Sequence, residues 1–218
     1  MPNIKQTYTF SATISEDIKK IIQEHIAEYE FIKVGEEVTV DKIHHSYMKV
    51  EHDDKLMNVK MLLDSHPQDK IIIFTQTKRN TKAISERLAD EGYKIGMLNG
   101  NMSQGKRMST LAAFKENKIR ILVTTDVAAR GLNMDNVGLV INFDVPNDTE
   151  SYIHRIGRTG RAGAHGKAIM FVSEKEIPFF LNIEKANKIK IRKSEEETIR
   201  DHKQKYLHIR LDRSTDKK

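Results

Sequence analysis

The sequence predicts an α/β fold: a parallel β-sheet with helices on both faces. Short apolar runs of three to five residues, rich in β-branched side chains, have the length and composition of buried strands. Apolar residues at helical spacing lie between these runs. This alternation of strands and helices is typical of βαβ units, in which helices cover both faces of a parallel sheet.

Five apolar runs are the expected strands. They lie at residues 71–74, 95–98, 121–123, 139–141 and 168–172. Helices are expected where apolar residues recur every three or four positions, as at Leu56, Val59 and Leu63. The domain that contains all of these elements extends over about 42–192.

The first 34 residues have a different pattern. Ser15 is a candidate N-cap, and Ile18 and Ile22 lie on one face of the helix that it would begin. Short strand fragments are expected on either side of this helix. Such elements bury too little surface for a core of their own. Residues 1–34 are therefore interpreted as the remnant of a preceding domain, and residues 35–41 as a linker.

The composition excludes several classes of protein. Without cysteine, the 218-residue chain has no disulfide framework, no thiolate nucleophile and no cysteine-based zinc site. No apolar run approaches the ~18 residues of a membrane-spanning helix. The N-terminal residues have no apolar signal-peptide core, so we expect a cytoplasmic protein without membrane contact. His44 and His45 would point to opposite faces of a strand, so no metal site is expected there.

The formal net charge of +6 is unevenly distributed along the chain. Residues 1–184 contain 25 basic and 25 acidic side chains, whereas residues 185–218 contain 12 basic and 6 acidic ones. Ser194, with Glu197 three residues later, resembles a capping box. Residues 193–218 are therefore expected to form a basic tail, first helical and then disordered. We expect this tail to add non-specific affinity for nucleic acid.

A phosphate-binding P-loop is the first candidate site. Residues 100–107, GNMSQGKR, fit G-x-x-x-x-G-K between an expected strand and an expected helix. Arg107, however, stands where a Ser or Thr hydroxyl is needed to bind Mg²⁺, and no acidic pair after an apolar run supplies a second metal ligand. The favoured interpretation is a polar turn in which Ser103 caps the next helix.

Residues 154–163, HRIGRTGRAG, carry the strongest functional signal. Three arginines and three glycines in ten residues are hard to explain by packing, and a solvated basic loop would not need the glycines. Glycine lets the backbone approach a ligand closely, and arginine binds phosphate oxygens through paired hydrogen bonds. Arg158 and Arg161 are three residues apart, so on one helical turn they would project to the same side.

Residues 124–133, TTDVAARGLN, follow an expected buried strand. In open α/β sheets, ligands bind beyond the carboxyl ends of the strands. Asp126 is either a ligand contact at such a position or the N-cap of a helix. The sequence leaves both interpretations open.

Taken in order, these motifs resemble those of the C-terminal half of DEAD-box ATP-dependent RNA helicases. The similar segments are FSAT at 10–13 for motif III, IIFT at 72–75 for motif IV, Gln104 and Arg107 for the Q-x-x-R element, 125–131 for motif V and 154–161 for motif VI. The resemblance covers the chain to about residue 190. It implies a RecA-like sheet at 42–192, after the remnant of a first RecA-like domain.

The resemblance implies an ATP site between two RecA-like domains. The first domain would supply the Walker lysine and the DEAD carboxylates, and with them the Mg²⁺ ligands. Arg161 would be the arginine finger at the γ-phosphate with Arg158 beside it, and His154 would couple to the first domain. Gly131 and Asn133 would face the ribose of the nucleotide. The family usually has Asp at the position of Asn133, so we expect a changed nucleotide affinity rather than a lost site.

The resemblance also implies binding to single-stranded or duplex RNA through phosphate and ribose groups. The implied contacts are Gly100 through its backbone N–H, Gln104, Arg107, Thr125 and Arg130. The other implied partner is the first RecA-like domain of the same protein. Without that domain, the chain is expected not to hydrolyse ATP. Two alternatives remain: a stand-alone RNA-binding or adaptor module without catalysis, and a nucleotidase that uses the 100–107 loop.

Overall fold

The computed structural model describes residues 8–10, 16–26, 28–32, 43–130, 132, 134, 137–160 and 166–195. The chain forms two compact units, Met1–Glu37 and Val38–Lys218. The predicted linker and the tail beyond Glu195 lie outside the described residues.

The first unit contains the expected helix, α1 (Glu16–His25), while the proposed cap Ser15 lies outside the described residues. The expected strand fragments lie at residues 8–10 and 31–34. Residues 8–10 and 31–32 belong to no helix or strand, and residues 33–34 lie outside the described residues. A strand needs a neighbour with which to share backbone hydrogen bonds. The described residues of this unit contain no such neighbour.

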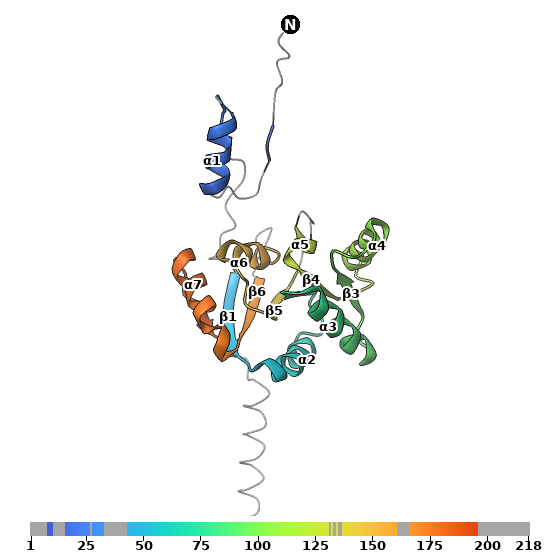
Figure 1. The fold of residues 1–218 in the computed structure, drawn as a ribbon. Helices are drawn as coiled ribbons and strands as arrows, with labels where there is room; N and C mark the ends of the chain where they lie inside the picture. The colour runs from blue at the N-terminus through green and yellow to red at the C-terminus, as the bar shows by residue number, and fades with distance from the viewer. Residues whose placement is uncertain are drawn as a thin grey trace, which may run out of the picture. The chain divides into compact units, whose positions relative to one another are not determined.

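The second unit contains one sheet of seven strands, all of them parallel (Figure 1). The strands are β1 (Ile43–Lys49), β2 (Ile71–Thr75), β3 (Ile95–Leu98), β4 (Ile121–Thr125), β5 (Leu139–Asn142), β6 (Gly166–Val172) and β7 (Arg192–Lys193). Their order across the sheet is β3-β4-β2-β5-β6-β1-β7. The predicted parallel α/β fold is confirmed, and β2 to β6 correspond to the five expected strands.

Strands β1 and β7 are not among the apolar runs. Polar residues, including His44 and Ser46, interrupt β1, so it has no continuous apolar stretch. β7 consists of two exposed basic residues, and Arg192 is in register with Ser46 of β1. Pairing with a neighbour, rather than the local sequence, makes these segments strands.

Helices cover both faces of the sheet. They are α2 (Lys55–Ser65), α3 (Lys78–Asp90), α4 (Gln104–Lys115), α5 (Asp126–Ala129), α6 (Thr149–Ile156) and α7 (Ile177–Asn187), with 3-10 turns η2 (His52–Asp54) and η3 (Glu174–Glu176). Ile71 and Ile73 of β2 pack in the core with α2 and α3, whereas Ile72 and Phe74 pack in the core with α4 to α7. Right-handed crossovers explain this division, because the connections of α2 and α3 run across the sheet in the opposite direction to the others.

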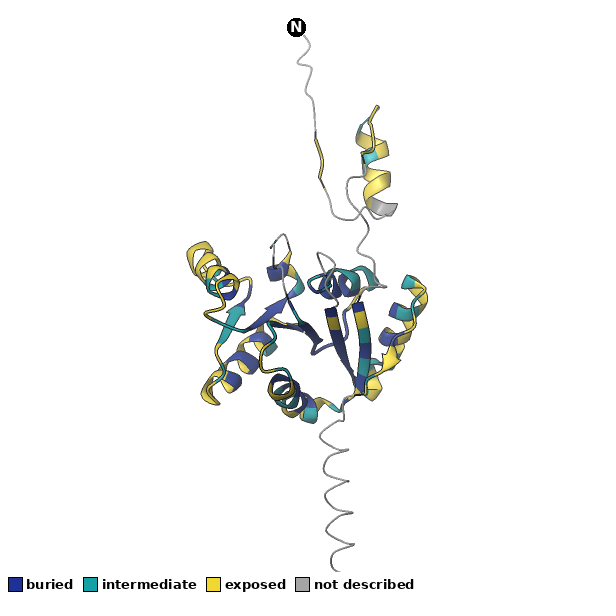
Figure 2. Cartoon of the chain, turned by 180° about the vertical axis from the view of Figure 1, so that it is seen from behind, coloured by how far each residue is buried: buried dark blue, intermediate teal, exposed yellow. Residues whose placement is uncertain are grey.

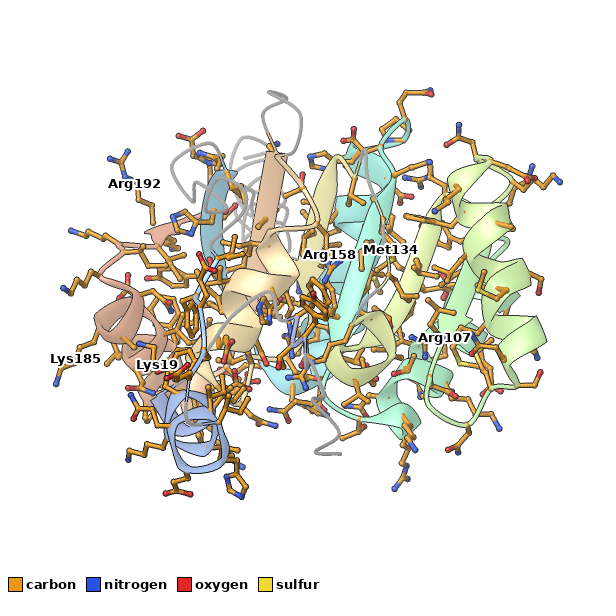
Figure 3. The ribbon with its side chains drawn as sticks, turned by 90° about the horizontal axis from the view of Figure 1, so that it is seen from above. Lys19, Arg107, Met134, Arg158, Lys185 and Arg192 are labelled. Atoms are coloured by element: carbon orange, nitrogen blue, oxygen red, sulfur yellow. The ribbon has the colours of Figure 1, made fainter. Side chains whose placement is uncertain are left out.

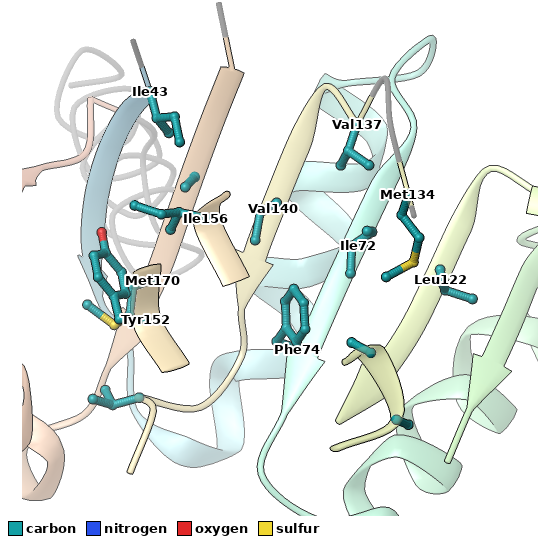
Figure 4. Close-up of a cluster of buried hydrophobic side chains, with 14 of the residues drawn as sticks. Ile43, Ile72, Phe74, Leu122, Met134, Val137, Val140, Tyr152, Ile156 and Met170 are labelled. Atoms are coloured by element: carbon teal, nitrogen blue, oxygen red, sulfur yellow. The ribbon is translucent and has the colours of Figure 1, made fainter. Parts of the chain in front are cut away.

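Helix α6 is held firmly on its face of the sheet. Tyr152 and Ile156 project from it into a buried cluster with Phe74, Val140 and Met170 (Figure 4). Figure 2 shows the strands beneath as mostly buried, with exposed residues on the outer sides of the helices. The start of the HRIGRTGRAG motif therefore lies on a rigid element.

The return from this motif to β6 depends on Gly166. A Cβ atom there would overlap the Thr159 side chain and the Gly160 backbone nitrogen. We expect Gly166→Ala to lower the free energy of unfolding by about 1–3 kcal/mol through overpacking, measured by urea denaturation. Gly105→Ala is the control, because a Cβ there meets open space within α4. Equal effects of the two substitutions would contradict this account.

Candidate nucleotide and nucleic-acid site

The candidate site is built around α5, a helix of four residues that directly follows β4. Thr125 ends β4, and its hydroxyl accepts a hydrogen bond from the Ala128 N–H at 3.4 Å. Thr125 is therefore the N-cap of α5. The N-cap interpretation of Asp126 is wrong: Asp126 is the first helical residue, and its carboxylate is bound by another side chain.

That side chain is Arg155, which lies in the HRIGRTGRAG motif but is not one of the predicted site residues. Its Nε and Nη2 atoms donate to the two carboxylate oxygens of Asp126 at 2.7 and 2.8 Å. Its Nη1 atom donates to the Asp144 carbonyl at 2.8 Å. Arg155 is only 1% exposed, so this pair joins α6 to α5 inside the protein. The helical spacing in the sequence could have indicated that Arg155 is buried, because it lies three residues after Tyr152 and so on the same face of α6.

Arg158 follows α6 and contacts the segment after α5. α6 ends at Ile156 and Gly160 has a φ of +69°, so residues 158–160 do not form the helical turn expected from Arg158 onward. The Nη1 atom of Arg158 donates to the Leu132 carbonyl at 2.7 Å. Arg161 lies outside the described residues, as do two further predicted site residues, Gly131 and Asn133.

His154 lies on α6, and its side chain lines the same depression as Arg155 and Arg158. Its Nε2 atom is buried, has no hydrogen-bond partner among the described residues and lies 4.0 Å from a carboxylate oxygen of Glu150. A depression beside it is lined by Phe74, Asp126, Ala129, Arg130, Ser151, His154, Arg155 and Arg158. Since Arg155 is paired with the one acidic group of this lining, the remaining charged groups are basic. Such a lining suits an anionic ligand.

Among the residues with implied RNA contacts, Arg107 reaches α5 from α4. Arg107 donates from Nη2 to the Ala128 carbonyl at 2.6 Å, which joins α4 to α5. Gln104 is exposed at the start of α4, and Gly100 and Arg130 are exposed in the connections. Figure 3 shows Arg107 on the side of α4 and Arg158 on the side of α6. The structure thus brings Arg107 and Thr125 to α5, and Arg158 to the segment that follows this helix.

The P-loop interpretation of residues 100–107 does not fit their structure. The Ser103 hydroxyl accepts from the Lys106 N–H at 3.4 Å, and the Ser103 carbonyl accepts from the Arg107 N–H at 3.0 Å. These N–H groups are used within α4, whereas a P-loop directs its N–H groups at phosphate. The expected cap at Ser103 is confirmed.

Lys78, at the start of α3, is a further basic residue near this loop. Its Nζ atom donates to Asn101 Oδ1 at 2.9 Å. A Cβ atom on Gly100 would lie 3.1 Å from Lys78 Cε, so the lysine packs closely against the loop. Its place three residues after the IIFT motif is the sequence signal that points to it.

Asp148 is the N-cap of α6, and its carboxyl group has a shifted pKa. Its carboxylate accepts from the Ser151 N–H and hydroxyl at 2.6 and 2.7 Å. Burial acts to raise the pKa of Asp148, but these hydrogen bonds and the charges of Arg130 and Arg155 outweigh it and lower the pKa below its usual 3.8.

We therefore expect ionised Asp148 to stabilise the fold above pH 3.8, and this stabilisation to disappear as the pH falls through the folded-state pKa. Asp148→Asn isolates the charge, because asparagine is also a good N-cap. The difference in Tm between the wild type and this variant should be constant near neutral pH and shrink below pH 3.8. A difference that is independent of pH would contradict the prediction.

Two features are absent from the part of the chain that the structure describes. Within those residues, no helix has the length and apolar character needed to cross a membrane. The same residues contain no group of three or more His, Asp or Glu side chains placed to hold a metal ion. Mg²⁺ ligands are expected, from the resemblance, in a first RecA-like domain.

Comparison with known proteins shows which family the sequence matches. The helicase conserved C-terminal domain family matches residues 53–163. Over 200 residues, 91% of this chain, the sequence is 42% identical to DEAD-box ATP-dependent RNA helicase CshA of Bacillus cereus and covers 38% of it. The chain spans about two fifths of the length of the curated relatives that it matches.

Solved structures show the same similarity. A DEAD box protein from Methanococcus jannaschii is 38% identical, with a TM-score of 0.68 over 85% of this chain and 50% of that one. Dbp5 of S. cerevisiae, solved bound to RNA and ADP BeF3, is 29% identical, with a TM-score of 0.77 and the same coverage of both chains.

Proposed function

This chain belongs to the helicase conserved C-terminal domain family, and on that basis we propose that it is the second RecA-like domain of an ATP-dependent DEAD-box RNA helicase. The resemblance to DEAD-box helicases is confirmed by the relatives. In the proposal, residues 42–192 form this domain, 1–34 end the first RecA-like domain, 35–41 link the two, and 193–218 form a basic tail. The domain completes an ATP site and contributes half of the RNA-binding surface. The intact helicase uses this surface to unwind short RNA duplexes.

One observation carries the proposal: arginines from two motifs are bonded to α5. Arg107, from the Q-x-x-R element, donates to the Ala128 carbonyl. Arg155, from the HRIGRTGRAG motif, holds Asp126. Both arginines thus bond to α5. A ligand that moves either arginine therefore changes the contacts of α5.

ATP is assigned to the depression between α5 and α6. Its basic lining suits phosphate. In this proposal the Nε2 atom of His154, which has no hydrogen-bond partner among the described residues, bonds a group of the first domain. Arg161 acts as the arginine finger with Arg158 beside it, while Gly131 and Asn133 face the ribose. ATP supplies the phosphoryl group, and an arginine at the γ-phosphate offsets the charge that develops on the transferring oxygens.

RNA is assigned to the side of α5 that faces α4. The proposed contacts to phosphate and ribose are the Gly100 N–H, Gln104, Arg107, Thr125 and Arg130. Contacts of this kind bind the RNA backbone without reading the sequence. The similar Dbp5 was solved with RNA and ADP BeF3 together, which is the combination of ligands that this proposal requires.

ATP turnover with and without RNA tests the proposal. We expect no turnover by this chain alone, and RNA-stimulated turnover when it is fused behind the first RecA-like domain of the Bacillus cereus relative. Turnover by the chain alone that is lost in Lys106→Ala would instead indicate a nucleotidase. An inactive fusion, together with RNA binding by the chain alone as tight as that of the fusion, would indicate an adaptor module.

A further inference from the structure

Two buried charged side chains and a half-buried one form a cluster outside the site described above, which we call the Lys55 cluster: Lys55, Asp144 and the half-buried Glu176. Lys55 begins α2 and is 1% exposed. Its Nζ atom lies 2.9 and 3.1 Å from the two carboxylate oxygens of Glu176, and 3.6 Å from Oδ1 of Asp144. One ammonium group thus lies between carboxylates from two distant segments, the β5–α6 connection and η3.

The two carboxylates of the cluster also bind the backbone of two connections. Asp144 Oδ2 accepts from the Gln76 N–H, directly after β2, at 2.9 Å. Glu176 Oε1 accepts from the Val145 N–H at 3.3 Å. Gln76 itself donates from Nε2 to the Val145 carbonyl at 3.1 Å. The β2–α3 and β5–α6 connections are therefore held to each other and to η3.

The charges are needed for this arrangement. Apolar side chains of similar size would fill the space but would not accept the N–H groups of Gln76 and Val145. Without Lys55, the buried carboxylate of Asp144 and the half-buried carboxylate of Glu176 would lose their cation, which is unfavourable. Burial acts to raise the pKa of Glu176, but hydrogen bonds from Ser173 and the charge of Lys55 outweigh it and keep the pKa below the usual 4.5.

Asp144 connects the cluster to the candidate site. Its side chain belongs to the Lys55 cluster, while its carbonyl accepts from Arg155 Nη1 at 2.8 Å. Arg155 in turn holds Asp126 of α5. The connection that contains Asp144 leads into α6, which carries His154 and is followed by Arg158.

We propose that Lys55 is a positioning residue: by holding Asp144 and Glu176, it sets the β5–α6 connection and so the placement of His154 and Arg158 relative to α5. Its effect on placement follows from contacts within this chain. Its effect on ATP turnover rests on the proposed function.

Lys55→Met in the 218-residue chain tests the placement directly. Lys60→Met is the matched control, because Lys60 also lies on α2 but pairs with Glu91 at 2.7 Å nearer the surface. In Lys55→Met we expect the Gln76 and Val145 amides to exchange hydrogen about tenfold faster relative to the amides of β4. The NMR amide resonances of His154 and Arg158 should also shift. Neither change is expected in Lys60→Met.

Glu176→Gln provides the same test if Lys55→Met does not fold. It keeps the shape of the side chain and leaves one acceptor oxygen for the four donors that Glu176 now serves, which are Lys55 Nζ, the Val145 N–H, and the N–H and hydroxyl of Ser173. The Val145 amide should therefore again exchange faster. The proposal is overturned by a folded variant in which Gln76 and Val145 exchange at the wild-type rate. Faster exchange that is equal in all strands would also overturn it, because that result means global destabilisation alone.

The fusion protein separates this proposal from the proposed function. There, Lys55→Met should lower kcat for ATP about tenfold with less than a twofold change in KM, as expected when only transition-state contacts are displaced. A KM that rises with an unchanged kcat would overturn the positioning role. If the local exchange changes occur but the wild-type fusion has no ATP turnover, the placement is supported and the proposed function is contradicted.

Discussion

Replacing Arg155 with methionine should lower the free energy of unfolding by about 3 kcal/mol. Arg155 is 1% exposed and binds both carboxylate oxygens of Asp126, so the variant leaves a half-buried carboxylate without its cation. The variant also removes the donor to the Asp144 carbonyl. Urea denaturation of the 218-residue chain at neutral pH measures the loss.

Two further variants identify the cause of this loss. In the double variant Arg155→Met with Asp126→Asn the unpaired charge is gone, so the combined loss should be smaller than that of the two single variants added together. Arg87→Ala, at an exposed position of α3, should change stability by no more than about 0.5 kcal/mol. Additive losses in the double variant would contradict the inference that this ion pair joins α5 to α6.

The second large effect is expected for Arg161→Ala in the fusion protein. Removing an arginine finger takes away a charge that stabilises the transferring phosphoryl group, so RNA-stimulated ATP turnover should fall by roughly 10³–10⁵-fold. The unfolding curve of the isolated chain should not change. Turnover of the fusion under saturating ATP and RNA gives the comparison.

Arg192→Ala is the matched control for that experiment. Arg192 is exposed in β7, at the end of the sheet order and outside the proposed site. Its loss should leave turnover unchanged. If Arg161→Ala retained turnover within about tenfold of the wild type, its assignment as the arginine finger would be wrong.

The central strands could be predicted because each is buried on both faces. β2 and β4 read as continuous runs of apolar or β-branched residues, and all their positions are buried. β1 has no such continuous apolar run, because His44 and Lys49 are exposed. It is a strand because it pairs with its neighbours β6 and β7. Strand pairing over long sequence distances is not encoded in any short window of residues.

The candidate site was predictable at the level of motifs but not at the level of individual side chains. The arginines of HRIGRTGRAG have the same chemistry in the sequence, yet Arg155 is buried against Asp126 while Arg158 reaches the Leu132 carbonyl near the surface. Lys55 belongs to no motif, and its two carboxylate partners lie far from it in the sequence. Burial and pairing of this kind depend on which elements come together.

By itself, the sequence determined the parallel α/β fold, the positions of its central strands along the chain and the motifs that resemble DEAD-box helicases. These features depend on local patterns of apolar residues, glycine and arginine. Only the tertiary structure decided which charged residues position the site and which remain available to a ligand. The physical reason is that a charge is stable in the interior only beside a partner. For Arg155 and Lys55 those partners, Asp126, Asp144 and Glu176, are brought together by the crossover connections of the sheet.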